Sequence, residues 1–179
     1  MPFLKIIAAC VLAAVVYGIV HDQITTRICV EYFTIFHQPI FGGTHSPTLL
    51  AFGWGLIATW WVGVLLGLPL AVIARVGLRR RLSVSELLPM IGTLLLIIAV
   101  CALVAGVTGY YRGTIPPYMA TMLPSEVHRR FVADWWAHTA SYASGFLGGV
   151  VVWVVALGRR LSGVSPVNSV EDIQLNVSN

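Results

Sequence analysis

Four long apolar stretches dominate this sequence, and they constrain its fold more than any other feature. A transmembrane helix needs about 20 mainly apolar residues to cross about 30 Å of hydrocarbon. Four stretches meet that requirement, at residues 3–20, 49–74, 87–109 and 140–157. Ser83 and Glu86 have the spacing of a capping box, which predicts the start of the third helix. The sequence therefore predicts an all-α membrane protein with four transmembrane helices in a lipid bilayer.

The amino-acid composition supports lipid as the main solvent of the chain. Of its 179 residues, 58% are hydrophobic and only 10% are charged, whereas soluble domains carry about 25% charged residues. We expect a single transmembrane domain over residues 1–160. Residues 161–179 are rich in Ser, Asn and Val without helical periodicity, which predicts a flexible cytoplasmic tail.

The positions of the basic residues predict the orientation of the helices, because cytoplasmic loops carry an excess of Lys and Arg. On the side of the two termini lie Lys5, Arg75, Arg79, Arg80, Arg81, Arg159 and Arg160, and on the other side lie Arg27, Arg112, Arg129 and Arg130. Both termini are therefore predicted to be cytoplasmic.

The first span has only a poor cleavage signature, so we expect it to be retained. Because the basic residues flank the apolar stretches, the net charge of +4 does not predict nucleic-acid binding.

Small residues spaced by four recur along two of the predicted helices. The first stripe consists of Gly55, Thr59, Gly63 and Gly67, and the second consists of Ser141, Gly145 and Gly149. Such stripes let helix backbones approach closely in lipid. They predict contacts between helices, between copies of the chain in a homo-oligomer, or with a larger membrane complex. Pro69 is expected to kink the second helix, and at least one of Trp60 and Trp61 is expected to pack inside the bundle.

Histidines gather on the side of the membrane opposite the termini. All five lie in or beside the two outer loops: His21, His37, His45, His128 and His138. The first outer loop is too apolar for an ordinary wet loop, and its pattern allows either a strand or a continued helix. We expect it to fold back over the mouth of the bundle. In the second outer loop, Val127, Phe131 and Trp135 share one side of a segment, which predicts an interfacial amphipathic helix before the last span.

A continuous helix through this segment would bring polar residues onto one face. Asp134, His138, Ser141 and Gly145 would share that face, and Asp134 could then orient the His138 ring, as carboxylates do around metals and catalytic bases. The complete candidate cluster at the outer face is His21, Asp22, Glu31, Tyr32, Asp134, His138, Ser141 and Tyr142.

Three interpretations of this outer cluster remain open from the sequence. The simplest is structural, because buried polar groups at the end of a bundle must pair with one another. The second is a divalent metal site, or a metal-dependent membrane enzyme, in which Glu31 and His138, together with His21 or Asp22, bind zinc, iron or manganese. No His-x-x-x-His spacing supports that site. The third is an accessory subunit or an oligomeric transporter, although the central parts of the spans contain no ionisable residue of the kind a proton-coupled carrier needs.

Several of these residues also carry a family resemblance. The stretches Asp22-Gln23-x-Thr25, Glu31-Tyr32-Phe33-Thr34 and His138-x-x-Ser141-Tyr142 resemble a family of small, uncharacterised bacterial membrane proteins with four helices. The resemblance covers most of the chain. It implies the four-helix architecture and a location in the bacterial inner (plasma) membrane, and it implies no particular activity.

Overall fold

The computed structural model describes residues 2–77 and 80–162, and every regular element in that part of the chain is helical. The elements are α1 (Pro2–Ile28), α2 (Val30–Thr34), α3 (Pro47–Ile57), α4 (Trp60–Arg75), α5 (Val84–Arg112), α6 (Pro117–Ala120), the 3-10 turn η1 (Ser125–Val127) and α7 (His128–Ser162). Four segments are long and apolar enough to cross a membrane: α1, the α3–α4 pair, α5, and η1 with α7. The prediction of four such helices is confirmed.

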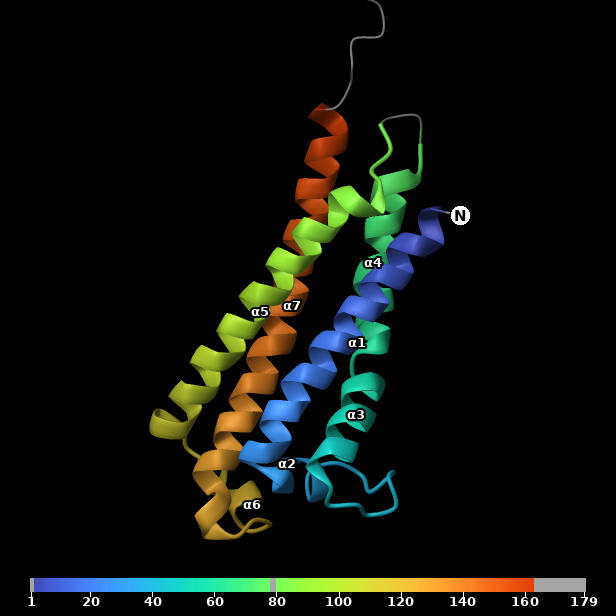
Figure 1. Ribbon diagram of the computed structural model, residues 1–179. Helices are drawn as coiled ribbons and strands as arrows, with labels where there is room; N and C mark the ends of the chain where they lie inside the picture. Colours follow the sequence, from blue (N-terminus) through green and yellow to red (C-terminus); the bar gives the residue numbers. More distant parts are fainter. Residues whose placement is uncertain (1, 78–79, 163–179) are drawn as a thin grey trace, which may run out of the picture.

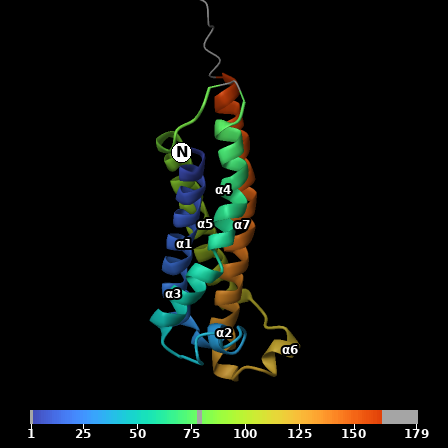
Figure 2. The same ribbon diagram turned by 90° about the vertical axis from the view of Figure 1, so that its right-hand side faces the viewer.

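The spans form two closely packed pairs, as Figure 1 shows. α1 packs along α3 and α4, and α5 packs along α7. Smaller contacts of α4 with α7 and of α1 with α5 join the two pairs, and the second view shows α4 running beside α7 (Figure 2). The start of α1 and the end of α7 lie at the same end of the bundle. The opposite end, which carries α2 and α6, is called the loop end below.

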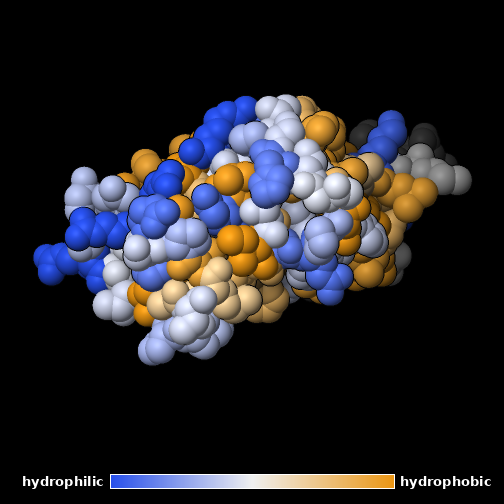
Figure 3. Space-filling view, turned by 90° about the horizontal axis from the view of Figure 1, so that it is seen from below, coloured by the Kyte–Doolittle hydropathy of each residue, from blue (hydrophilic) through white to orange (hydrophobic). Residues whose placement is uncertain are grey.

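The outer surfaces of the spans are apolar, as lipid exposure requires. Leu12, Leu49, Leu103 and Leu147, one from each span, are all at least 60% exposed. The loop end is mixed: hydrophilic residues alternate there with hydrophobic ones (Figure 3), and Ile40, Tyr118 and Met122 are exposed among its loops. Such a surface suits the boundary between hydrocarbon and water, where apolar and polar groups are both solvated.

Local sequence signals explain where the helices begin. The capping box is confirmed, because the Ser83 hydroxyl accepts from the Glu86 N–H and the Glu86 carboxylate accepts from the Ser83 N–H at 2.9 Å. Ser46 caps α3 in a similar way, with Pro47 in the first turn, where a proline costs no hydrogen bond.

The glycine stripe of the second span packs against α1 within the chain. A Cβ atom at Gly55 would stand 2.6 Å from the Ile19 Cα, and one at Gly63 would stand 2.5 Å from the Val11 Cα. At these two positions only the absence of a side chain permits the approach of the two backbones. In the second stripe, a Cβ at Gly149 would stand 2.7 Å from the Leu66 Cδ2, whereas one at Gly145 would meet the Ile98 Cδ1 at 3.5 Å, so Gly145 borders open space.

The second span departs from the prediction in its middle. It is interrupted between α3 and α4, at Ala58 and Thr59, whereas the helix continues through Pro69. The Thr59 hydroxyl donates to the Gly55 carbonyl, and such back-bonding bends helices. Trp60 and Trp61 directly follow the break, and both are half-exposed. The expectation that one of them packs inside is therefore wrong, and the indole that does so is Trp153, which donates to the Leu66 carbonyl at 2.9 Å.

At the loop end, the helices extend further than their apolar stretches. α1 continues to Ile28, and the predicted interfacial helix is the first part of a single 35-residue helix, α7. The first outer loop folds back over the bundle as a short helix, α2, and contacts both α1 and α7. α7 also includes Leu161 and Ser162 of the predicted tail. The rest of that tail, 163–179, lies outside the described residues.

Candidate functional site

Three side chains from two helices converge inside the loop end of the bundle. His21 and Asp22 come from α1, and His138 comes from α7. Each offers one nitrogen or oxygen atom that can bind a metal, and these atoms all lie within 4.8 Å of one another. Asp22 and His138 are largely buried. We call these three residues the metal-ligand cluster.

The hydrogen bonds of His138 fix the role of each ring nitrogen. Its Nδ1 lies 2.8 Å from the Asp134 carbonyl oxygen, and because a carbonyl only accepts, Nδ1 must carry a hydrogen. In a neutral ring Nε2 then presents a lone pair. That lone pair faces the Asp22 carboxylate oxygen at 3.3 Å. Two acceptors facing each other require a proton or a cation between them.

His21 adds a second unused nitrogen to the metal-ligand cluster. Its Nε2 is buried and has no hydrogen-bond partner among the described residues. The His21 ring meets the His138 ring edge-on at 4.6 Å and stacks on Tyr17 at 5.7 Å. The Tyr17 hydroxyl is bonded to Ser141 at 2.9 Å, so it leaves the His21 nitrogen free. Burying a polar atom without a partner costs free energy, and a cation bound to this nitrogen would remove that cost.

An aromatic cover closes the metal-ligand cluster from the loop end. Tyr32 of α2 stacks on the His138 ring at 4.7 Å, and Phe33 meets the same ring edge-on at 5.6 Å. His37 holds this cover in place through a 2.8 Å bond to the Tyr32 carbonyl. Burial raises the pKa of Tyr32 and lowers the pKa of His37. Both side chains are therefore neutral near pH 7, and the cover places no charge beside the metal-ligand cluster.

Two of the predicted site residues take other roles. Glu31 stays out of the metal-ligand cluster, and its carboxylate instead accepts from the Cys29 thiol at 3.4 Å. Burial raises the pKa of that thiol to about 12, so it stays protonated and can donate. Asp134 orients His138 through its backbone carbonyl. Its carboxylate is buried, with both oxygens unpaired among the described residues, so the predicted carboxylate–imidazole bond does not form.

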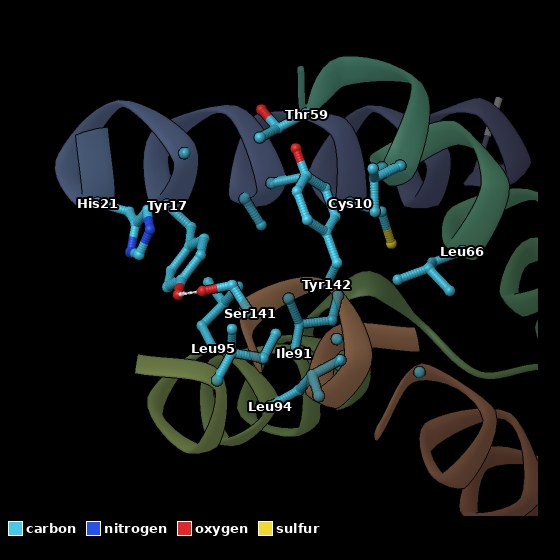
Figure 4. A pocket seen from close by; sticks show the side chains of 18 of the residues that line it. Cys10, Tyr17, His21, Thr59, Leu66, Ile91, Leu94, Leu95, Ser141 and Tyr142 are labelled. Atoms are coloured by element: carbon cyan, nitrogen blue, oxygen red, sulfur yellow. Dashed lines mark hydrogen bonds between the residues drawn. The ribbon is translucent and has the colours of Figure 1, made fainter. Parts of the chain in front are cut away.

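An apolar cavity of about 120 Å³ leads from the metal-ligand cluster into the bundle. It lies between the two helix pairs and is drawn in Figure 4, with Tyr17 and His21 at one end and Cys10 and Leu66 at the other. The predicted residues Ser141 and Tyr142 line it, beside His138. Tyr17 also lines it, although the sequence pattern did not predict it as a site residue. The signal available was its spacing of four residues from His21, inside a stretch whose composition is otherwise typical of a lipid-facing helix.

Comparison of the chain with protein families, with curated proteins and with solved structures finds no match. The chemical features of the site are its donor atoms, their separations and the cavity beside them.

Proposed function

We propose that this is a multi-pass membrane protein that binds a divalent transition-metal ion through His21, Asp22 and His138. The observation that carries the proposal is the facing pair of acceptors, His138 Nε2 and Asp22 Oδ1, with a ring nitrogen of His21 within 4.8 Å of them and the buried His21 Nε2 without a partner among the described residues. A cation bound to all three atoms satisfies every one of them at once. Two imidazoles and one carboxylate suit zinc, iron or manganese.

The separation of one pair of donor atoms supports this proposal, and the donor of His21, within 4.8 Å of them, must move closer to bind the same ion. Two ligand atoms that each bind a metal at about 2.1 Å, at tetrahedral or octahedral angles, stand about 3.0–3.4 Å apart. The 3.3 Å between His138 Nε2 and Asp22 Oδ1 falls in that interval. Three protein ligands leave at least one coordination position open, as catalytic metal sites do. The adjoining cavity gives a ligand access to that position.

Metal content tests the proposal directly. Protein purified in mild detergent and incubated with zinc, iron(II) or manganese is expected to retain about one ion per chain. His138→Ala and Asp22→Asn are each expected to lower that occupancy by about tenfold or more, because the first removes a donor nitrogen and the second replaces a charged carboxylate with a neutral amide. Elemental analysis of the dialysed protein gives the measurement.

His45→Ala provides the matched control, because His45 is an exposed histidine of the same loop end. It is expected to leave the metal content unchanged. Native protein that retains none of the three metals would contradict the proposal. The His138–Asp22 contact would then be an ion pair that only holds α1 to α7.

We further propose that the metal-ligand cluster lies at the outer face of the bacterial inner membrane, with both termini in the cytoplasm. The excess of Lys and Arg at the termini end supports this orientation. Single cysteines in a background without native cysteines provide the test. His45→Cys at the loop end is expected to react with a membrane-impermeant maleimide in intact cells, and Ser85→Cys only after permeabilisation. Both positions are exposed, and both changes preserve every Lys and Arg. The reverse labelling pattern would overturn the orientation.

A further inference from the structure

The cavity beside the metal-ligand cluster is polar at one end and apolar along the rest of its length. The polar end is formed by Tyr17, His21, Asp22, His138, Ser141 and Tyr142. The remainder is lined by side chains such as Cys10, Leu70, Ile91 and Leu94. A ligand that fits such a cavity has one polar end and one hydrocarbon end.

The length of the cavity indicates an extended ligand. On α1 its lining runs from Cys10 to Asp22, which corresponds to about 18 Å at the helical rise per residue. A hydrocarbon chain in one leaflet spans half of the bilayer core, or about 15 Å. One acyl or prenyl chain therefore matches the distance from the metal-ligand cluster to the far end of the cavity.

Two polar side chains along the apolar part of the wall are already hydrogen-bonded within the protein. The Thr59 hydroxyl donates to the Gly55 carbonyl, and the Trp153 indole donates to the Leu66 carbonyl. These two side chains offer water few further partners, and apolar cavities stay dry. Tyr142 is 44% exposed although it lines the cavity, and Figure 4 shows its ring between Thr59 and Cys10. The wall is therefore open at Tyr142, where a lipid chain can enter.

We propose that the cavity binds a single-chain amphiphile, with its hydrocarbon chain between the two helix pairs and an anionic oxygen of its headgroup at the metal. This inference rests on the proposed metal site and adds the class of ligand that the site takes. Carboxylate and phosphate oxygens both bind zinc, iron and manganese. A fatty acid and an alkyl or prenyl phosphate therefore share the required chemistry.

Photo-crosslinking in vesicles tests the proposal. The probe is palmitate with a diazirine near the end of its chain, added to native protein loaded with metal. Crosslinks are expected at the apolar end of the cavity, on peptides that contain Cys10, Leu70 or Ile91, and they should be suppressed by excess unlabelled palmitate. Competition by dodecyl phosphate separates the two headgroups, since stronger suppression by one of them identifies the preferred oxygen. Labelling that is confined to lipid-facing side chains and does not saturate would overturn the proposal.

Gly145→Leu fills the cavity and tests the same proposal. A Cβ at Gly145 has room, with only the Ile98 Cδ1 at 3.5 Å. Saturable crosslinking is expected to fall about tenfold, which corresponds to roughly two displaced methylene groups. Gly92→Leu is the control, because nothing lies within 4 Å of a Cβ at that exposed position of α5. Should Gly145→Leu fail to fold, Ala14→Leu blocks the cavity from α1. Unchanged crosslinking in the folded variant would overturn the proposal.

Metal content distinguishes failure of this inference from failure of the metal site. Gly145→Leu changes none of the three ligands, so its metal content is expected to equal that of the native protein. His138→Ala is expected to lose metal and to weaken saturable crosslinking together. If native protein binds metal but gives no saturable crosslink, the amphiphile proposal is contradicted and the metal-site proposal stands. If saturable crosslinking is equal in His138→Ala and native protein, binding of the hydrocarbon chain does not depend on the metal. That result would contradict the proposed contact between headgroup and metal.

Discussion

Replacement of Gly55 or Gly63 with alanine is expected to lower the stability of the protein by about 2 kcal/mol, the usual range for overpacking a close contact. At Gly55 the added methyl group would lie 2.6 Å from both the Cα and the amide nitrogen of Ile19, and at Gly63 it would lie 2.9 Å from the Cys10 carbonyl oxygen. These neighbours are backbone atoms of α1, so no side-chain rotation relieves the overlap. The two helices must move apart, which also removes the contacts between them.

Thermal unfolding in a mild detergent measures this effect. A loss of about 2 kcal/mol corresponds to a fall of about 5 °C in Tm for a chain of this size. Gly92→Ala is the matched control, because an added methyl group there meets nothing within 4 Å. Alanine has the higher helix propensity, so this control is expected to leave Tm unchanged or slightly raised. Equal Tm values for Gly63→Ala and Gly92→Ala would mean that α1 does not pack on this stripe.

The sequence was informative where a feature depends on neighbouring residues. Run length alone identified the four spans, because bilayer thickness sets a minimum number of apolar residues. The spacing of Ser83 and Glu86 identified the start of α5. Helical periodicity placed Asp134 one turn before His138, although the His138 ring is bonded to the Asp134 backbone carbonyl and not to the predicted carboxylate. Each of these features is decided within a few residues.

The site itself depends on contacts between distant parts of the chain. Asp22 and His138 are 116 positions apart, and their contact requires α1 and α7 to meet at one depth. Nothing in either local pattern sets that depth. The sequence predicted Glu31 as a ligand, with Asp22 as an alternative to His21, but the chain leaves the helix at Cys29 and α2 folds back. That turn directs the Glu31 carboxylate to the Cys29 thiol. The positions at which helices are interrupted, such as Cys29 and the residues before Trp60, depend on side-chain packing and on side-chain hydrogen bonds to the backbone. The length of an apolar stretch does not determine them.

Arg160→Ala is expected to destabilise the termini end of the bundle by about 3 kcal/mol, because it removes a buried charged donor from several acceptors. Arg160 is 5% exposed near the end of α7. Its Nη1 donates to the carbonyls of Ile73 and of Val76, the latter at 2.8 Å, and its Nε donates to the Arg80 carbonyl at 2.7 Å. The last carbonyls of a helix have no partner within it. Arg160 therefore caps α4 from a neighbouring helix.

Arg159→Ala separates this capping role from the effect of charge on membrane orientation. Arg159 precedes Arg160 in the chain, is exposed, and within the described part of the chain donates one hydrogen bond, at 3.5 Å, to the Glu86 carbonyl. Both variants remove one positive charge from the same end, so any loss of insertion or orientation should be equal in the two. Only Arg160→Ala is expected to lower Tm in detergent substantially. Arg160→Lys is expected to fall between them, because an ammonium group keeps the charge but lacks the planar fork that reaches several carbonyls at once. Equal Tm values for the two alanine variants would show that the charge, and not the hydrogen bonds, is what the bundle requires at Arg160.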